Sequence, residues 1–460
     1  MLKSLRYIFI VLLLLLLSSV SLANPLVRIG IINGKDAVTI SGQRPFKVIQ
    51  VSDGAAIGTA NAGEKWELTQ VEGHLYLNNK RVDTPVVFRM EPGDENEYLT
   101  VNGRRYRGDI EVRPSVTKKG LTVIETLPLE EYIYGIIALE ISPAWSTEAV
   151  KAQAVAARTY ALYHLGKHRI DGFDLCSTTD CQVYGGREAE DIRGNGAVDA
   201  TRGMVVTYKS KLIPAFFHSS GGGYTENSEN VWGNKADYLR AVPDYDQNGA
   251  QFKWKITFTA EELTSRLEGM GYKIGTLDAV KLSTLHSGVN DAPDRGISGR
   301  VKSITFIGSN QTIVLDGNEV RRILKLNSTL FDILPANPNT SPEVLNVSTS
   351  ILLGTDKSEA KQTIVLTPKL KKQKDKTAPM LIKDEPLPLK PVREEPVTRL
   401  FTGTPKNSSI TIEGRGFGHG LGMSQWGAKA MAEQGPQDDC TYYQQILKHY
   451  YQGIDISKWY

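Results

Sequence analysis

The chain has 460 residues, with 54 lysines and arginines, 51 aspartates and glutamates, 40% apolar residues and three cysteines. This composition excludes a disordered or fibrous protein, and the length suffices for one large domain with appendages. The formal charge of +3 falls to +1, with 52 basic against 51 acidic residues, once residues 1–23 are set aside. A nucleic-acid-binding protein would carry a strong basic excess, so we expect no nucleic-acid partner.

Residues 1–23 have the organisation of an export signal. Two basic residues precede an apolar run from Tyr7 to Leu17, and the small residue Ala23 fits a cleavage site before Asn24. An uncleaved membrane anchor is the alternative, but the run is shorter than the roughly 20 apolar residues that a span needs. We therefore expect an extracytoplasmic protein, in the periplasm, in the cell wall or secreted, without a stable membrane span after cleavage.

A β-rich module is predicted over residues 24–97. Short apolar runs alternate there with turn residues, including the turn-forming pairs Asn33-Gly34 and Asp53-Gly54. No catalytic constellation occurs in this stretch, so its simplest role is a spacer or a wall-contacting domain.

The remainder is predicted to form a mixed α and β domain in two parts, residues 98–334 and 408–460. Between them, residues 335–407 contain the run KLKKQKDK and five closely spaced prolines. This composition predicts a disordered or extended insertion; a solvated linker is favoured over a segment that attracts anionic polymers. The expected class is therefore α+β, with two helices at the cleft of the catalytic domain.

The segment from Leu129 to Glu140, LEEYIYGIIALE, has the periodicity of a helix whose buried face ends in an acid. Its apolar residues recur every three or four positions, and Glu140 continues the stripe just before Pro143. Burial and the helix terminus both disfavour an ionised carboxylate, and burial must supply the larger share because the dipole is worth under about one pKa unit. Glu140 is therefore a candidate general acid. The alternatives are a frayed, solvated helix end or pairing with a buried arginine.

A second helix is predicted from the capping Ser146 to about Gly166. Lys151 and Arg158 lie on one face of it, separated by small residues, so their long side chains can converge on one side of a cleft. The alternative interpretation is two ordinary exposed charges on an alanine-rich helix.

The stretch GRGFGHGLGMSQWG, residues 414–427, alternates glycine with larger residues, among them His419. On extended backbone one side would be bare glycine, open to a ligand or to another element of the protein. The segment matches neither a phosphate loop nor a dinucleotide-binding fingerprint. His218 precedes two serines, but the chain lacks the GxSxG elbow, so a serine hydrolase is disfavoured.

Cys176 and Cys181 stand five positions apart, with His164 and His168 upstream. Outside the cytoplasm a local disulfide is the default, and a zinc site is the sharper alternative. The disulfide is favoured because the histidines would have an atypical offset for zinc. No metal or other cofactor is expected. Cys440 has no partner in this interpretation and is expected to act as a small apolar residue.

Five ordered motifs together resemble the stage II sporulation protein D family, SpoIID, and the related amidase-enhancer LytB proteins. They are LPLEEYIYGIIALEIS, TEAVKAQAVAARTYAL, CQVYGG, AFFHSSGGGYTE with VWG, and GRGFGHGLGMSQWGA followed by YYQQILKHYYQGIDI. The resemblance covers roughly residues 98–334 and 409–460.

The resemblance implies an exported lytic transglycosylase that cleaves the bond between N-acetylmuramic acid and N-acetylglucosamine in peptidoglycan glycan strands. It places the catalytic glutamate on Glu140 and functionally important cations on Lys151 and Arg158. Some relatives bind zinc near this CQxY motif through two cysteines and two histidines, whereas here Asp180 stands beside Cys181. Further candidates for the cleft wall are Gln182, Tyr184, His218, His419 and Gln425.

Two functions of other classes stay open at the level of the sequence. One is a wall-binding protein without catalytic activity that enhances a partner amidase. The other is a zinc hydrolase that uses Cys176, Cys181 and histidines. The single-acid mechanism is favoured because a transglycosylase needs no second carboxylate when a hydroxyl of the substrate is the nucleophile.

Overall fold

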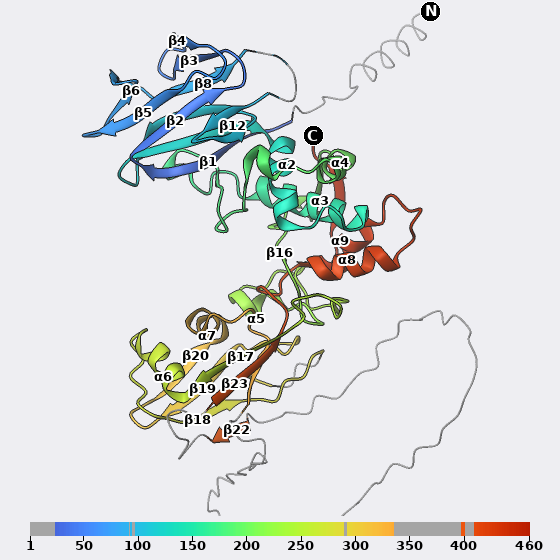
Figure 1. Ribbon diagram of the computed structural model, residues 1–460. Helices are drawn as coiled ribbons and strands as arrows, with labels where there is room; N and C mark the ends of the chain where they lie inside the picture. Colours follow the sequence, from blue (N-terminus) through green and yellow to red (C-terminus); the bar gives the residue numbers. More distant parts are fainter. Residues whose placement is uncertain (1–23, 92, 94–96, 289–291, 335–396, 401–408) are drawn as a thin grey trace, which may run out of the picture.

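The computed structural model of the chain describes residues 24–91, 93, 97–288, 292–334, 397–400 and 409–460 (Figure 1). The expected export signal lies outside the described residues, as does most of the expected insertion. The helices and the several sheets confirm the predicted α+β class. Within the described ranges, none of the helices combines the length and the hydropathy that a membrane span requires.

Two packed sheets form the N-terminal module. The first, in the order β13-β1-β12-β11-β8-β3-β4, consists of β1 (Leu26–Lys35), β3 (Phe46–Gln50), β4 (Ala56–Ala60), β8 (Val86–Met90), β11 (Asp109–Pro114), β12 (Leu121–Pro128) and β13 (Leu175–Cys176). The second, in the order β10-β9-β2-β5-β6-β7, consists of β2 (Ala37–Gly42), β5 (Trp66–Val71), β6 (His74–Leu77), β7 (Lys80–Val82), β9 (Leu99–Val101) and β10 (Arg104–Tyr106).

Alternating burial explains why these segments form sheets. In β2, Val38 and Ile40 point into the core while their neighbours are half-buried, as expected of a strand with one face covered. The sheets continue past residue 97, the predicted boundary, because β11 pairs with β8 and β12 pairs with β1.

A helical layer follows β12 directly (Figure 1). It contains α2 (Leu129–Glu140), α3 (Thr147–Tyr163), α4 (Ile192–Ala200), α8 (Gln425–Gln434), α9 (Tyr443–Tyr450) and the short 3-10 turns η1 (Arg169–Asp171) and η2 (Gly186–Ala189). A small sheet of β14 (Met204–Tyr208), β15 (Lys211–Leu212) and β25 (Asp455–Lys458) packs beside α3. Alanine makes up much of α3, which suits a helix buried on nearly every side.

A second β body carries its own sheets. One sheet contains β17 (Lys253–Thr259), β21 (Phe331–Leu334) and β23 (Ser409–Arg415); the other contains β18 (Leu277–Leu282), β19 (Ser303–Gly308), β20 (Thr312–Asp316) and β22 (Val397–Leu400). Its helices are α6 (Ala260–Glu268) and α7 (Gly317–Leu324). The strand β22 lies within the segment predicted to be a disordered or extended insertion, and it pairs with β18.

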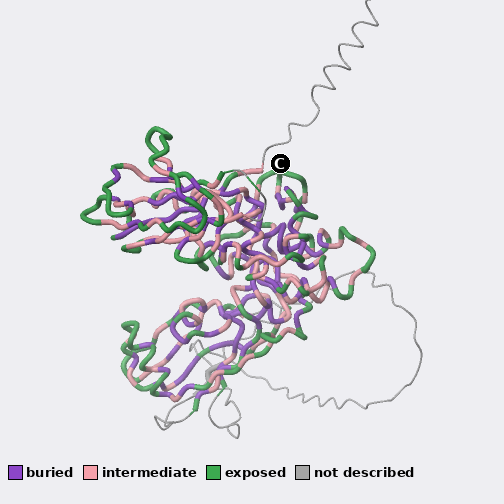
Figure 2. The backbone as a smooth tube through the Cα atoms, turned by 45° about the horizontal axis from the view of Figure 1, so that its top comes forward, coloured by how far each residue is buried: buried purple, intermediate pink, exposed green. Residues whose placement is uncertain are grey.

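The buried apolar residues form two cores, not one (Figure 2). The first spans the N-terminal module and the helical layer, and the second fills the other β body. The domain predicted over residues 98–334 therefore contains parts of both. Between the two bodies lie β16 (Phe217–His218), which pairs in parallel with β24 (Met423–Ser424), and the short helix α5 (Ser228–Trp232).

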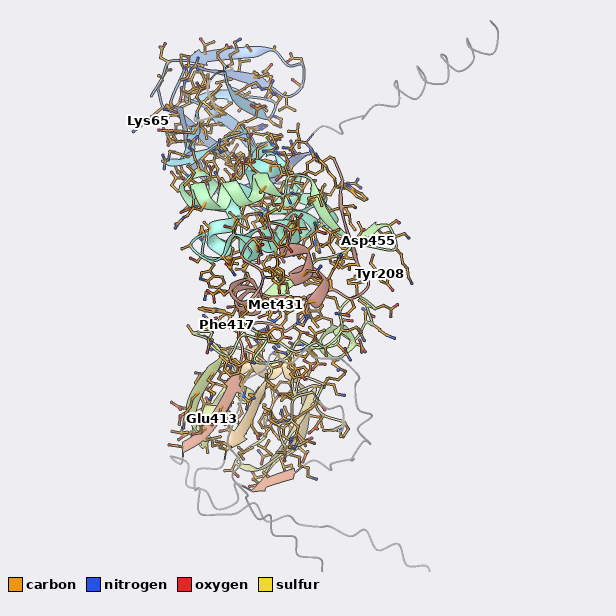
Figure 3. The ribbon with its side chains drawn as sticks, turned by 90° about the vertical axis from the view of Figure 1, so that its right-hand side faces the viewer. Lys65, Tyr208, Glu413, Phe417, Met431 and Asp455 are labelled. Atoms are coloured by element: carbon orange, nitrogen blue, oxygen red, sulfur yellow. The ribbon has the colours of Figure 1, made fainter. Side chains whose placement is uncertain are left out.

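The glycine-rich segment connects the second body to α8, and Figure 3 shows Glu413 on β23 and Phe417 nearer the helical layer. The backbone through this segment is not one regular extended strand. Four alternate glycines have positive φ, which larger residues rarely adopt: Gly416 (74°), Gly418 (114°), Gly420 (83°) and Gly422 (67°). A Cβ at Gly420 would lie 2.1 Å from Nε of Arg300, so close packing, the alternative interpretation, accounts for the glycine there.

Candidate active site

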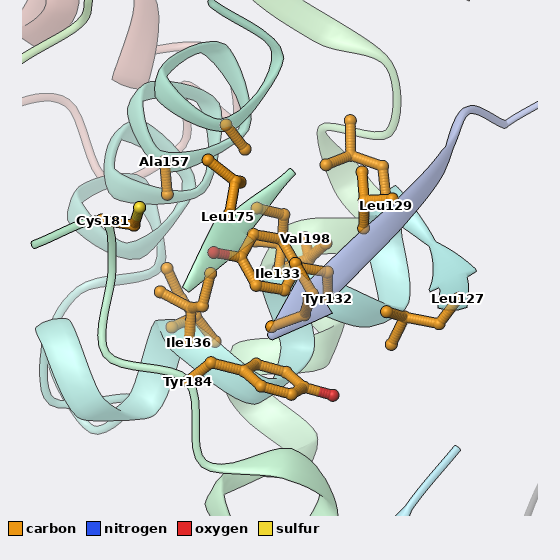
Figure 4. Packing of buried hydrophobic residues seen from close by; sticks show 14 of the residues in the cluster. Leu127, Leu129, Tyr132, Ile133, Ile136, Ala157, Leu175, Cys181, Tyr184 and Val198 are labelled. Atoms are coloured by element: carbon orange, nitrogen blue, oxygen red, sulfur yellow. The ribbon is translucent and has the colours of Figure 1, made fainter. Parts of the chain in front are cut away.

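Glu140 is the last residue of α2, and the stripe that precedes it is buried as predicted. Tyr132, Ile133 and Ile136 are fully buried against α3 and β12 (Figure 4), while Glu140 itself is half-buried. The helix ends because Ile141 adopts extended backbone, followed by Pro143. The carboxyl group therefore lies at the edge of the core and at the negative end of the helix dipole.

Two hydrogen-bond donors hold the Glu140 carboxylate: the side-chain amide of Gln425 and the backbone N–H of Val183. Loss of hydration raises the pKa of Glu140, and the two donors lower it by a smaller amount, so the pKa is raised overall. A carboxyl group whose pKa is raised in this way is better suited than a solvated one to donate a proton and to take it back.

Two further glutamines adjoin the groups that contact Glu140: Gln153 contacts Gln425, and Gln182 precedes Val183. Gln425 Nε2 donates to Oε1 of Gln153 at 3.4 Å, and Gln182 Nε2 donates to the carbonyl of Ala157 at 3.4 Å. Gln153 and Gln182 are buried, yet Gln153 Nε2 and Gln182 Oε1 have no hydrogen-bond partner among the described residues. Buried polar groups are nearly always paired, so one donor and one acceptor remain here for a ligand or for water.

The segments that carry Glu140 and Gln425 also carry a pair of tryptophans in contact. Trp145 follows Glu140 by five positions, and Trp426 follows Gln425 directly; their ring centroids are 4.8 Å apart. Lys429 places its ammonium group 5.5 Å from the Trp426 ring centre and pairs with Glu433 at 2.7 Å. This pair could not be predicted, because Trp145 and Trp426 are far apart along the chain.

Lys151 does not converge on Glu140 as predicted. Its ammonium group donates to Oε1 of Glu148 at 2.7 Å and to the carbonyl of Cys440 at 2.9 Å. The backbone N–H of Tyr443 donates to the same glutamate. Lys151 thus ties α3 to the start of α9, and the expectation that it binds glycan is corrected by these contacts.

Arg158 is also placed differently from the prediction, because its guanidinium is fully buried. It forms a two-point ion pair with Glu130 (2.9 and 2.6 Å) and donates to the carbonyls of Met204 and Val198. Glu130 also accepts from the hydroxyl of Tyr460. Arg158 therefore joins α2, α3 and the C-terminal strand, and it has no surface that a glycan can reach.

Tyr184 belongs to the core and not to the site. Its ring packs 5.2 Å from that of Tyr132, and its hydroxyl donates to Glu125 at 2.8 Å. Burial raises the pKa of Glu125 to about 7. Gly135 is required opposite this ring, because a Cβ there would lie 2.3 Å from Tyr184.

His218 and His419 lie together, with ring centroids 5.4 Å apart. His218 pairs with Ser424 in the β16–β24 ladder, one residue before Gln425. Its Nδ1 contacts the carbonyl of Leu421 at 3.1 Å, and burial lowers its pKa well below the usual range. Nδ1 of the neutral ring therefore carries the proton, and the buried Nε2 is an acceptor without a partner among the described residues.

The predicted disulfide between Cys176 and Cys181 is absent, since both thiols are free. Instead, one donor atom each from His168, Cys176, Asp180 and Cys181 lies within 4.8 Å of the others. Spacing along the chain cannot show this convergence, because Asp180 and His168 are brought together by the intervening turns.

This donor set fits a zinc ion. Zinc accepts cysteine sulfur, histidine nitrogen and aspartate oxygen in four-coordinate sites, so Asp180 can serve where relatives use a second histidine. His168 points Nε2 toward Asp180 at 3.0 Å, and its Nδ1 contacts Asp171 at 3.3 Å, the kind of supporting carboxylate that orients a ligating imidazole. The loop that carries these donors continues through Gln182 to Val183, beside Glu140.

A cavity of about 690 Å³ lies away from this centre, between the N-terminal module and α2 and α4. Charged and polar groups line it, among them Arg107, Glu131, Asp199 and Arg202. Glu140 is not part of its lining, so the cavity is separate from the candidate active site.

Comparison with known proteins gives two family matches and several relatives. A family model described as "Stage II sporulation protein", SpoIID, matches residues 117–208, and one described as "Domain of unknown function (DUF8618)" matches residues 233–348. An uncharacterized protein of Brachyspira hyodysenteriae is 29% identical over 435 residues, which are 94% of this chain and 92% of the relative.

Two relatives from Bacillus subtilis carry informative names. The "Amidase enhancer" is 30% identical over 405 residues, 86% of this chain and 50% of that protein, so the chain spans about half its length. "Stage II sporulation protein D" is 27% identical over 351 residues, 73% of this chain and 76% of that protein. The glutamate at the end of α2 lies inside the matched SpoIID region.

Proposed function

Because the chain belongs to the SpoIID/LytB family, we propose that it is a peptidoglycan lytic transglycosylase with Glu140 as its general acid and base. The bond cleaved is that between N-acetylmuramic acid and N-acetylglucosamine, and the product ends in an anhydromuramyl sugar. One observation carries the proposal: a half-buried carboxyl group with a raised pKa, held by two directed donors at a helix end.

The proposed reaction needs only this one carboxyl group. Protonated Glu140 first gives its proton to the glycosidic oxygen as the bond from that oxygen to the muramyl C1 breaks. The resulting carboxylate then takes the proton of a hydroxyl on the same muramyl sugar as this hydroxyl bonds to C1. Glu140 ends protonated and no water is consumed, so a second carboxylate of the kind used by ordinary glycosidases is unnecessary.

The surrounding groups support this cycle in different ways. Gln425 and Val183 stabilise the ionised state that exists between the two proton transfers. Gln153 supports Gln425 from behind, because its Oε1 accepts a hydrogen bond from the Gln425 amide. The ring pair of Trp145 and Trp426 supplies an apolar surface for a sugar face.

His168, Cys176, Asp180 and Cys181 would hold the zinc ion. The ion would fix the conformation of the loop that ends at Val183, and it would take no part in the reaction. This loop positions one of the two donors to Glu140.

The substrate lies outside the cytoplasm, so we propose that the protein acts there after export. The charged and apolar pattern of residues 1–23 supports this localisation.

The test compares the purified chain with Glu140→Gln on peptide-free and peptide-bearing glycan strands, with anhydromuramyl ends counted by mass spectrometry. We expect the products from the unchanged chain and a loss of at least about 100-fold in the variant, the scale of a missing general acid. Glu268→Gln is a matched control, because Glu268 also ends a helix but is exposed. Equal product formation by both glutamate variants would refute the role of Glu140.

A second candidate is favoured by the name of one relative, the "Amidase enhancer". In this case the chain binds the wall without turnover and accelerates a cell-wall amidase. The same preparation decides between the two: faster amidase hydrolysis by unchanged chain and by Glu140→Gln alike, without anhydromuramyl ends, would identify an enhancer.

A further inference from the structure

A row of aromatic rings leads away from the Glu140 centre. We call it the aromatic track, and it consists of Tyr160, Tyr163, His164, Phe216, Trp232 and His419. Neighbouring rings lie close: His164 is 4.0 Å from Tyr160 and 6.2 Å from Phe216, Phe216 is 4.5 Å from Trp232, and Trp232 is 5.1 Å from His419. The track therefore runs from the end of α3 across the residue preceding β16 to α5, at the junction of the two bodies (Figure 1).

The rings remain accessible although they touch one another. Tyr163 is 49% exposed and Trp232 is 45% exposed, and the others are half-buried. Aromatic side chains in contact usually complete a core, and Phe216 does pack against one here. Packing does not account for Tyr163 and Trp232, because nearly half of each side chain is exposed.

Two elements connect the track to the catalytic centre. On α3, Gln153, Tyr160 and His164 are spaced by seven and four residues, so they share one helix face. In the β16–β24 ladder, Phe217 pairs with Met423, and the next pair leads to Gln425. The ladder places the track beside the segment that carries Gln425, so a chain molecule bound at Glu140 can extend onto the track.

The track is electrically neutral around pH 7. Burial lowers the pKa of His419 to about 3 and that of His164 below its usual range, and burial raises the pKa of Tyr160. Charged groups face His419 from other elements: Arg300 and Arg321 both lower its pKa, and Lys167 lowers that of His164. Because the rings themselves carry no charge, their faces can stack on the apolar C–H faces of sugar rings.

A polar group at the His419 end of the track fits the same ligand. His218 is buried beside His419, and its Nε2 is an acceptor with no partner among the described residues. Sugars present hydroxyl donors on their edges and apolar C–H faces above and below. A row of rings that ends at a free acceptor matches both features.

We propose that the aromatic track is a binding surface for the glycan strand beyond the cleaved bond, so that the chain holds several consecutive sugars and favours long strands over short fragments. This proposal rests on the proposed function, since it extends the substrate site of Glu140.

The experiment measures binding and not turnover. The full chain carrying Glu140→Gln is titrated with peptide-free glycan of two sizes, short fragments and long strands, by calorimetry. Adding Trp232→Ala should weaken the long strands by roughly tenfold and leave the short fragments unchanged, since a ring contact is worth about one factor of ten. Trp459→Ala is the matched control, because Trp459 is 41% exposed but lies outside the track.

Further arms separate the possible outcomes. Trp232→Tyr keeps a ring and should restore most of the affinity, which excludes a mere folding defect. Equal affinity of Trp232→Ala and Trp459→Ala for long strands would overturn the proposal, as would tight, Trp232-dependent binding of a phosphate-containing wall polymer in place of glycan. A failure of the proposed function gives a different result. Chains that keep Glu140 then yield no anhydromuramyl ends, although Trp232→Ala still weakens the binding of long strands and not that of short fragments.

Discussion

Burial raises the pKa of Glu140 and Gln425 lowers it by a smaller amount, so the removal of Gln425 has a calculable effect. Its amide donates to the carboxylate and thereby favours the ionised form. Gln425→Met removes the donor while preserving the length of the side chain. The pKa of Glu140, which burial already raises, should then rise further.

The size of the change follows from the bond. A hydrogen bond to a charged group contributes about 1.5–3 kcal/mol, and one pKa unit corresponds to about 1.4 kcal/mol. Glu140 is only half-buried and keeps its bond from Val183, so the lower end applies and we expect an increase of about one unit.

The pH profile of kcat/KM reports this increase. Glu140 must be protonated to act as an acid, so the rate falls as the pH rises through its pKa. In Gln425→Met this basic limb should move to higher pH by about one unit, whether or not the maximal value of kcat/KM also changes. Carbon-13 NMR of the Glu140 carboxyl should show the same shift without any substrate.

Gln434→Met is the control, because Gln434 is exposed at the other end of α8. A basic limb that stays in place in Gln425→Met, or moves to lower pH, would refute the assignment of Gln425 as the donor that tunes Glu140.

Two further predictions concern residues that the structure places away from the proposed chemistry. Arg158→Met leaves Glu130 charged and buried, so urea unfolding should show a loss of about 3–5 kcal/mol that Glu130→Leu in the same chain largely restores; unchanged stability with weakened glycan binding would instead make Arg158 a ligand contact. The chain purified with zinc should hold about one ion, and Asp180→Ala should weaken zinc affinity at least about tenfold and lower the melting midpoint. A zinc-free chain whose midpoint ignores chelators would contradict that assignment.

Periodicity was the most informative property of the sequence. The stripe from Leu129 to Ile137 predicts a buried helix face, and the structure buries it and leaves Glu140 at its edge. In the glycine-rich segment, alternation did not indicate a strand. The glycines at every second position have positive φ, and such a segment shows the same period of two as a strand. The N-terminal strands were predictable because their burial alternates along each strand.

Partners distant along the chain were not predictable. Arg158 and Glu130 lie on different helices, and a helical face alone does not show whether a cation meets solvent or a buried acid. Gln153 was not predicted for the same reason. The available signal was that it is a polar residue within the buried, alanine-rich face of α3. Cys176 and Cys181 were close enough for a disulfide by spacing, but only the turns reveal that His168 and Asp180 join them.

The contact between Gln153 and Gln425 joins residues 272 positions apart, with the whole second β body between them. Closing so long a loop is entropically costly and slow, so this part of the structure should form late in folding. During synthesis the ribosome releases α2 and its acid long before the segment that supplies the amide donor. A nascent or proteolytically clipped molecule lacking the residues after β23 would carry the Glu140 carboxyl group without the Gln425 amide, so the pKa of Glu140 would stay higher until that segment has docked.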